Sequence, residues 1–309
     1  MVGRNFWKSA PERACYAPSV RFSARLSVLT ALFLAAGCHE TTGTLLTFAE
    51  PQTSDADDGG GVDSGIGAPM FLPGPDTTWQ LQLTGTIDTS FDVDLYELDL
   101  FALDAAIAKR LHDRGRSLAC YISVGTAEPY RADYASFPAS AIGNPLADYP
   151  EEHWLDHRNQ QVRALMAARL QLASDSACDA VELSSLQAHS EDSGFALTRA
   201  DDLDYARWLL AECHQRGLSA GVSTSNDLVA SLAAEADWGV TAECLVNDDC
   251  QAWQPFSSAS KAVFVVEYGS NSDAPALCSE AARLGYSLVV KRRALDAFRA
   301  GCPASAADP

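Results

Sequence analysis

Positive charge is scarce in this sequence. Its 309 residues include 22 Lys and Arg against 41 Asp and Glu, which gives a formal net charge of −19 at pH 7. Because nucleic-acid binding requires a basic surface, this balance argues against a nucleic-acid partner, whereas a cationic ligand would suit it. The sequence also lacks an internal repeat and a glycine-rich phosphate-binding loop at the start of any helix, so we expect no cofactor.

Long hydrophobic runs are absent as well. The apolar run 26–34 is too short to span a bilayer and follows Arg21 and Arg25. It leads into Leu34-Ala35-Ala36-Gly37-Cys38, which resembles a bacterial lipobox, in which the Cys becomes the first mature residue and carries the lipid. We predict that residues 1–38 are a lipoprotein-type signal and that Cys38 anchors an exported, monomeric protein at the outer membrane or cell surface, its only membrane contact. A plain signal peptide is the alternative.

The next segment is acidic and rich in glycine. Residues 39–77 contain no Lys or Arg and include the string Asp55-Ala56-Asp57-Asp58-Gly59-Gly60-Gly61. Such a composition buries too little apolar surface to offset the entropy cost of folding. We predict a disordered tether over 39–77, a folded domain over 78–302 and a short tail over 303–309.

The folded region alternates short apolar strands with helices. Helical spacing of apolar residues predicts helices over Leu103–Arg114, Gln160–Ser174 and Asp201–Arg216, and a glycine follows the first and the last. The candidate strands are Trp79–Leu83, Asp94–Leu100, Ser117–Ser123, Asp179–Ser184, Ser219–Ser223, Trp238–Ala242, Ala262–Glu267 and Tyr286–Val290.

Eight such strands favour a single (β/α)8 TIM-type barrel, an α/β fold, over an open doubly wound sheet. In such a barrel the chemistry lies at the carboxyl ends of the strands. The longest strand-to-helix connection, 125–158, is then expected to cover the barrel mouth.

Six stretches together carry a family resemblance through their order and spacing. They are Trp79–Asp88, Asp94–Asp99, Cys120–Gly125, Phe137–Ser140, Trp154–Arg158 and Val265–Tyr268. The region 78–302 resembles glycoside hydrolase family 114, the endo-α-1,4-polygalactosaminidases. The resemblance implies a (β/α)8 barrel and an α-1,4-linked, galactosamine-containing polysaccharide as partner, with a cationic amino-sugar polymer among the candidates.

The sequence departs from the family pattern at the strand ends that carry the family's catalytic acids. The family's Val-Glu-Pro-Asp-Asn-Val-Asp corresponds to Val181–Gln187, which puts Ser184 at the catalytic Asp. Its Val-Asn-Glu-Gln-Cys corresponds to Val240–Cys244, which puts Ala242 at the second carboxylate. Two further strand ends also depart from the family pattern: they read Ser223-Thr224-Ser225 and Lys291-Arg292 in this sequence. Glycosidic cleavage usually needs two carboxyl groups, so the resemblance implies impaired or lost catalysis.

Three glutamates are candidate substitutes for the missing acids. Glu128 follows the third strand, where the family also has a Glu. Glu182 precedes Ser184 by two residues and, because side chains alternate along a strand, points the same way. Glu243 would face away from the site on an extended strand unless a bulge or register shift returns it. The candidate substrate-binding residues are Gln82, Tyr121, Trp154, Asp156, Arg158, Ser223, Glu267, Tyr268 and Lys291.

Cysteines favour disulfides over metal ligation in an exported chain. The resemblance implies a local disulfide between Cys244 and Cys250, and Cys278 and Cys302 flank the last strand unit and could form a second. Within 78–302 the pairing of the other three cysteines stays open; they are Cys120, Cys178 and Cys213. His153 and His157 are four residues apart, but no zinc-protease pattern lies between them, so no metal site is expected.

Two functions remain open from the sequence. One is a polysaccharide-binding barrel that has lost turnover. The other is an active endo-acting hydrolase that uses Glu128, Glu182 or Glu243. Two carboxylates facing each other across the mouth at about 5–9.5 Å would favour the hydrolase.

Overall fold

The structure, a computed structural model, describes residues 70–302. The predicted signal with Cys38, most of the predicted tether and the predicted tail lie outside these residues, so those predictions stay untested. Within residues 70–302, no helix has the length and apolar character that crossing a membrane requires.

Parallel strands form the barrel that the sequence predicted. Hydrogen bonds join them in chain order, and the short antiparallel strand β12 (Ala300–Gly301) follows β11 at the edge. All eight expected strands are present, with ends within two residues of those predicted. They are β1 (Trp79–Gln82), β2 (Leu95–Asp99), β3 (Ser117–Ser123), β7 (Ala180–Ser184), β8 (Ser219–Val222), β9 (Trp238–Ala242), β10 (Val263–Tyr268) and β11 (Ser287–Lys291).

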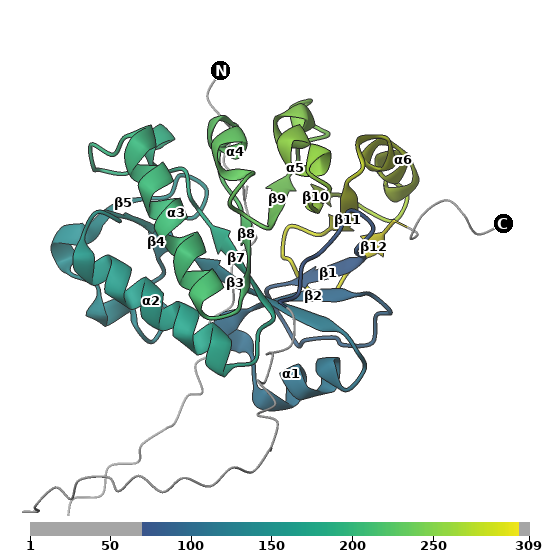
Figure 1. Cartoon of the computed structure of the whole chain (residues 1–309), viewed down its shortest axis with the longest axis horizontal. Coiled ribbons are helices and arrows are strands. Elements are labelled where there is room, and N and C mark those ends of the chain that lie inside the picture. The colour runs from purple at the N-terminus through teal and green to yellow at the C-terminus, as the bar shows by residue number, and fades with distance from the viewer. Residues whose placement is uncertain (1–69, 303–309) are drawn as a thin grey trace, which may run out of the picture. The chain divides into compact units, whose positions relative to one another are not determined.

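Helices surround these strands (Figure 1). The α-helices are α1 (Ala105–His112), α2 (Gln160–Asp175), α3 (Arg199–Gln215), α4 (Asn226–Leu232), α5 (Gln254–Ser258) and α6 (Ala274–Leu284). Helix α3 begins two residues earlier than predicted because Thr198 and Asp201 form a capping box. Short 3-10 helices occupy the connections: η1 (Leu100–Ala102), η2 (Tyr134–Ser136), η3 (Ala139–Ala141), η4 (Ala188–Ser190) and η5 (Cys250–Trp253).

The segment that follows β11, residues 292–299, lies between β11 and β1 and is called the strap below. Leu295 accepts hydrogen bonds from Leu83 N at 2.8 Å and Thr84 N at 3.2 Å, and Arg299 Nε donates to Trp79 O at 2.9 Å. In the described part of the chain no helix separates β1 from β2, so this strap and the loop after β1 complete the wall of the (β/α)8 barrel.

Side chains alternate between two apolar cores. One core fills the barrel interior and includes Trp79, Trp238 and Phe264, whose rings pack at centroid distances of 4.7 and 5.5 Å. The other lies between the sheet and the helices and takes the intervening residues, such as Val181 and Leu183 of β7. This alternation turns every second strand residue toward the barrel interior, and the last such residue of each strand lies nearest the mouth.

The long connection after β3 carries a small antiparallel sheet rather than an irregular loop. Its strands are β4 (Thr126–Ala127), β5 (Ile142–Pro145) and β6 (His153–Leu155), in the order β4-β6-β5. From this connection Tyr149 packs against the interior core beside Ala242 and Tyr268. The predicted cover over the mouth is therefore present and partly ordered as a sheet.

Three disulfides link the described residues. Cys244–Cys250 and Cys278–Cys302 form as predicted. The pairing left open resolves to Cys120–Cys178, which joins β3 to the segment before β7, while Cys213 is free and buried.

Candidate functional site

The barrel mouth is lined by inward-facing residues at the carboxyl ends of the strands. Ser123 and Ser184 end the neighbouring strands β3 and β7, Ser223 directly follows the next strand, β8, and all three are buried. The next strand ends at Ala242, which packs against the interior core. The inward-facing residues at these four strand ends therefore carry hydroxyl groups and a methyl group rather than carboxylates.

A carboxyl pair lies one layer deeper. Glu97 of β2 and Glu182 of β7 are both 0% exposed. Burial raises the pKa of Glu97 well above its ordinary value, and the charge of Glu182 raises it further. Burial also raises the pKa of Glu182, and the neighbouring Glu97 and Ser223 partly oppose that rise. Like charges this close disfavour double ionisation, so we expect the pair to retain a proton at neutral pH.

Several buried polar atoms of this layer make no hydrogen bond of normal geometry within the described residues. They are the four carboxyl oxygens of Glu97 and Glu182 and the hydroxyl oxygens of Ser184 and Ser223. Ionised carboxylates only accept hydrogen bonds, whereas a protonated member of the pair becomes a donor for the other. A proton shared between Glu97 and Glu182 would therefore give their carboxyl oxygens a hydrogen bond. Such a shared proton agrees with the upward direction of both pKa shifts.

Glu128 is committed to an ion-pair cluster. Arg131 donates to Glu128 at 2.7 and 2.9 Å and makes a bidentate pair with Asp99 at 2.8 Å. The Glu128 side chain is 3% exposed, and Tyr130 adds a hydrogen bond at 2.5 Å. Arg131 thus donates to both carboxylate oxygens of Glu128. This arrangement suits a structural anchor beneath the mouth cover.

Glu243 lies at the rim of the mouth, turned there by its backbone. Its φ of 58° is left-handed and ends β9 immediately after Ala242. The carboxylate pairs with Arg293 at 2.6 Å, and the Arg293 guanidinium lies 4.4 Å from the ring centroid of Tyr268. The extended conformation of β9 ends before Glu243. Strand alternation therefore does not require the Glu243 side chain to face away from the mouth.

Two predicted substrate-binding residues hold the barrel together. Gln82 donates to Thr84 O and Thr86 O at 3.0 and 2.8 Å. Lys291 donates to Gln80 and to carbonyls of the strap, including Asp296 O at 2.9 Å. Burial lowers the pKa of Lys291 to about 7. These side chains have their polar atoms committed within the fold.

Glu267 belongs to the outer face of β10. Its neighbours Val266 and Tyr268 pack with the interior core, so alternation turns Glu267 the other way. Its carboxylate accepts from Leu245 N at 2.8 Å, and burial raises its pKa to about 7. Of the strand-end residues predicted from sequence, those facing the interior are Tyr121, Glu182, Ser184, Ser223, Ala242 and Tyr268.

The predicted residues of the long connection lie around the mouth cover. Trp154 is 3% exposed and packs with Ala188 and Leu197. Asp156 and Arg158 pair with each other at 2.8 Å, and Arg158 also donates to Ala196 O. Because Trp154 and Arg158 both contact the segment after β7, they tie that segment to the mouth cover.

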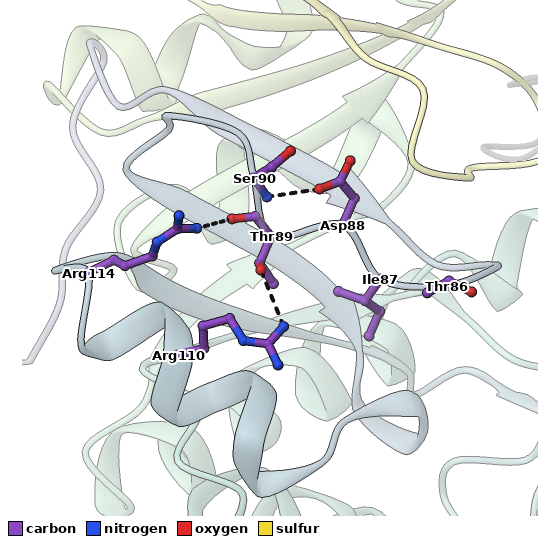
Figure 2. A pocket seen from close by; sticks show the side chains of 7 residues that line it. All are labelled: Thr86, Ile87, Asp88, Thr89, Ser90, Arg110 and Arg114. Carbon is purple, nitrogen blue, oxygen red and sulfur yellow. Dashed lines mark hydrogen bonds between the residues drawn. The ribbon is translucent and has the colours of Figure 1, made fainter.

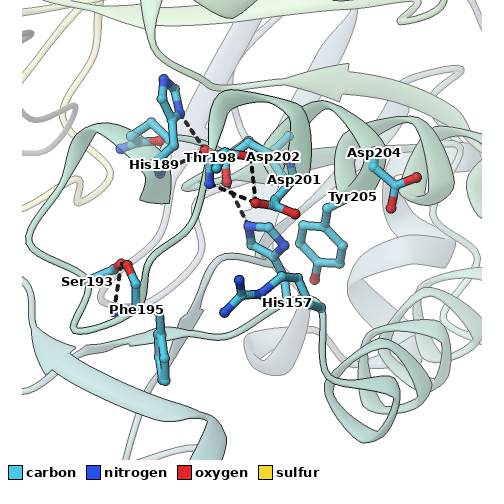
Figure 3. A network of polar contacts seen from close by, with 12 residues as sticks. His157, His189, Ser193, Phe195, Thr198, Asp201, Asp202, Asp204 and Tyr205 are labelled. Carbon is cyan, nitrogen blue, oxygen red and sulfur yellow. Dashed lines mark hydrogen bonds and ion pairs between the residues drawn. The ribbon is translucent and has the colours of Figure 1, made fainter.

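Asp202 of α3 anchors the same segment through two imidazoles (Figure 3). His157 Nε2 lies 2.7 Å from one carboxylate oxygen and His189 Nδ1 lies 2.6 Å from the other. His157 also stacks on Tyr205 at 4.6 Å. His157 is thus a structural ligand of Asp202, and no cluster of three or more metal-ligating side chains occurs within residues 70–302.

A separate hollow of about 610 Å³ lies between α1 and the loop after β1 (Figure 2). Arg114 donates to Thr89 O at 2.5 Å, and Arg110 lies 3.5 Å from Thr89 Oγ1. Asp88 is its one acidic residue, and it accepts from Ser90 N at 2.8 Å. A hollow with a single carboxylate cannot supply the acid pair of glycosidic cleavage.

Sequence reasoning missed Glu97 and Arg293. Glu97 had a signal, because a lone charge in the middle of an apolar strand, with Leu95 facing inward two residues earlier, must lie in the interior. Arg293 had none, because its position depends on the loop after β11.

The fold and the mouth are those of a glycoside-hydrolase-type (β/α)8 barrel. The family model of glycoside-hydrolase family GH114 matches residues 65–307, and the chain belongs to that family. The predicted family and fold are therefore confirmed. No curated protein sequence matches the chain.

Solved structures agree with this assignment. Ega3 of Aspergillus fumigatus, solved in complex with galactosamine, is 30% identical with a TM-score of 0.72, over 76% of this chain and 99% of Ega3. The glycoside hydrolase domain of PelA from Pseudomonas aeruginosa is 16% identical with a TM-score of 0.60, over 72% of this chain and 97% of that one. At that identity the PelA likeness concerns the fold alone.

Proposed function

We propose that this protein binds a galactosamine-containing polysaccharide at the barrel mouth with impaired or lost hydrolysis, and that a lipid on Cys38 holds it at the cell envelope. The ligand class follows from membership in GH114 and from the likeness to Ega3, which was solved with galactosamine. The net charge of −19 favours a partner that carries amino groups.

One observation carries the loss of hydrolysis. The strand ends of β7 and β9 present Ser184 and Ala242, neither of which can donate or accept a proton as a carboxyl group does. The other candidate acids are engaged, since Glu128 pairs with Arg131 and Glu243 pairs with Arg293.

Hydrolysis through Glu182 is the second candidate function. Glu182 faces the interior below Ser184, and burial raises its pKa, as a general acid requires. Against this, its side chain is fully buried and its carboxyl neighbour Glu97 is fully buried as well.

Two measurements on the wild-type protein separate these functions. Binding of α-1,4-linked galactosamine oligomers is measured by calorimetry, and release of reducing ends is measured on the polymer. We expect binding without release. Release that Glu182→Gln abolishes would establish the hydrolase instead, and the absence of any binding would refute the carbohydrate function.

A further inference from the structure

Arg293 places a positive charge at the mouth of a barrel proposed to bind amino sugars. Its guanidinium pairs with Glu243 at 2.6 Å and covers the Tyr268 ring at 4.4 Å. The Arg293 side chain is 34% exposed and that of Glu243 is 16% exposed. This contact therefore lies at the boundary between the interior and solvent, where a ligand would arrive.

The two partners of Arg293 have the chemistry of an amino-sugar site. A carboxylate is the natural partner of an ammonium group, and an aromatic face stacks on a sugar or a cation. Tyr268 and the neighbouring Ala242 both pack above the interior core. The charges of Glu243 and Arg293 both act on Tyr268, with opposite signs, so the three groups share one environment.

We propose that Arg293 occupies the position at which Glu243 and Tyr268 would otherwise bind the ammonium group of a galactosamine residue, and so favours an N-acetylated, uncharged residue at this one position of the polymer. This inference rests on the proposed function and specifies the chemical form of its ligand.

The physical basis is competition for one carboxylate. An ammonium group that reaches Glu243 must displace the guanidinium already paired with it, and a second cation beside Arg293 is repelled. An N-acetylated residue carries no charge and needs neither change. Selectivity between two ligand forms arises in this way from a repulsive element as much as from an attractive one.

The test compares fully deacetylated with fully N-acetylated galactosamine oligomers of equal length. Arg293→Met removes the charge but keeps a long side chain over Tyr268. We expect it to raise affinity for the deacetylated oligomer by about fivefold, the scale of a partly exposed ion pair, and to leave affinity for the acetylated oligomer nearly unchanged.

Two further variants isolate the cause. Arg292→Met is the matched control, because Arg292 pairs with Asp296 and stacks on Phe298 instead; it should change neither affinity. Adding Glu243→Gln to Arg293→Met should abolish the gain, because the freed carboxylate is then lost.

The outcomes distinguish this inference from the proposed function. If wild type binds but Arg293→Met gains no affinity for the deacetylated oligomer beyond the Arg292→Met control, the inference is wrong and the proposed function stands. A gain that survives Glu243→Gln also overturns it. If wild type and all variants bind neither oligomer, the proposed function fails and the inference falls with it.

Discussion

Glu97 and Glu182 make the stability of this barrel depend on pH. Burial raises both pKa values from the usual 4.5. Above pH 4.5 the folded state therefore holds more protons than the unfolded state, and the free energy of unfolding falls as pH rises toward the raised folded values. Glu267, with a pKa raised to about 7, acts in the same direction.

Glu182→Gln should remove part of this dependence. The amide cannot ionise, so the variant should gain about 1–3 kcal/mol in unfolding free energy at pH 8 relative to wild type. The gain should shrink below pH 4.5, where the wild-type carboxyl is protonated in both states. Denaturant unfolding across pH 4–8 measures it, with exposed Glu151→Gln as the control. A constant difference at all pH values would contradict the shared-proton pair.

Ser184 and Ala242 are the positions where an acid pair could be restored. Their strands, β7 and β9, flank β8, so their backbones lie about 9–10 Å apart at the usual strand spacing. Side chains that converge toward the barrel axis from there fall within the 5–9.5 Å range of glycosidase carboxylates.

Ser184→Asp combined with Ala242→Glu should therefore produce reducing-end release from α-1,4-linked galactosamine polymer. Each single change should do far less, because the two acids act as a unit. Ser184→Asn with Ala242→Gln is the matched control, similar in volume and without charge. Robust release by wild type would refute the vacated-site hypothesis.

At the scale of elements, the Trp238 indole packs so closely against β8 that the strand carries a glycine at the contact. Gly221 lies inward on β8, and a Cβ there would clash with the Trp238 ring of β9. Trp238 is fully buried and donates to Ser219 Oγ at 3.2 Å. The glycine thus allows a large aromatic side chain to fill the interior below the mouth.

Gly221→Ala should lower the free energy of unfolding by about 1–3 kcal/mol, the usual cost of overpacking. Gly74→Ala is the control, because nothing lies within 4 Å of a Cβ there. Thermal unfolding of both variants measures the effect. Equal melting temperatures would mean that the indole can shift without cost.

Polar contacts fasten the segment after β7 to its surroundings. The Asp202 carboxylate is hydrogen-bonded to the imidazoles of His157 and His189, and Arg158 of the long connection donates to Ala196 O. Asp156 and Arg158, two of the predicted sugar-binding residues, pair with each other beside this segment. The cover of the mouth is therefore assembled from two loops that fasten one another.

At the scale of the whole molecule, net charge should govern binding of a cationic ligand. With a formal charge of −19, the protein attracts ammonium-bearing oligomers over a distance set by the Debye length. Raising NaCl from 50 to 500 mM should weaken binding of the deacetylated oligomer about tenfold. The N-acetylated oligomer, measured by the same titration, should change little. Equal salt dependence for both would exclude this long-range contribution.

The sequence by itself determined the barrel and the inward side chains. Alternation along a strand has a period of two whatever surrounds it, so the common direction of Glu182 and Ser184 could be predicted, and Glu97 was within reach of the same argument. The order of strands and helices likewise indicated the (β/α)8 barrel, since such units bury their apolar faces in few ways.

Only the tertiary structure decided which side chains meet. Glu97 and Glu182 come from strands separated by β3. Cys120 of β3 pairs with Cys178, directly before β7, rather than with Cys213, because β3 and β7 are neighbours in the sheet. Glu243 reaches Arg293 through a left-handed residue and a loop that lies 50 residues further along the chain. Contacts between distant segments depend on barrel closure and loop conformation, which local patterns of hydrophobicity do not encode.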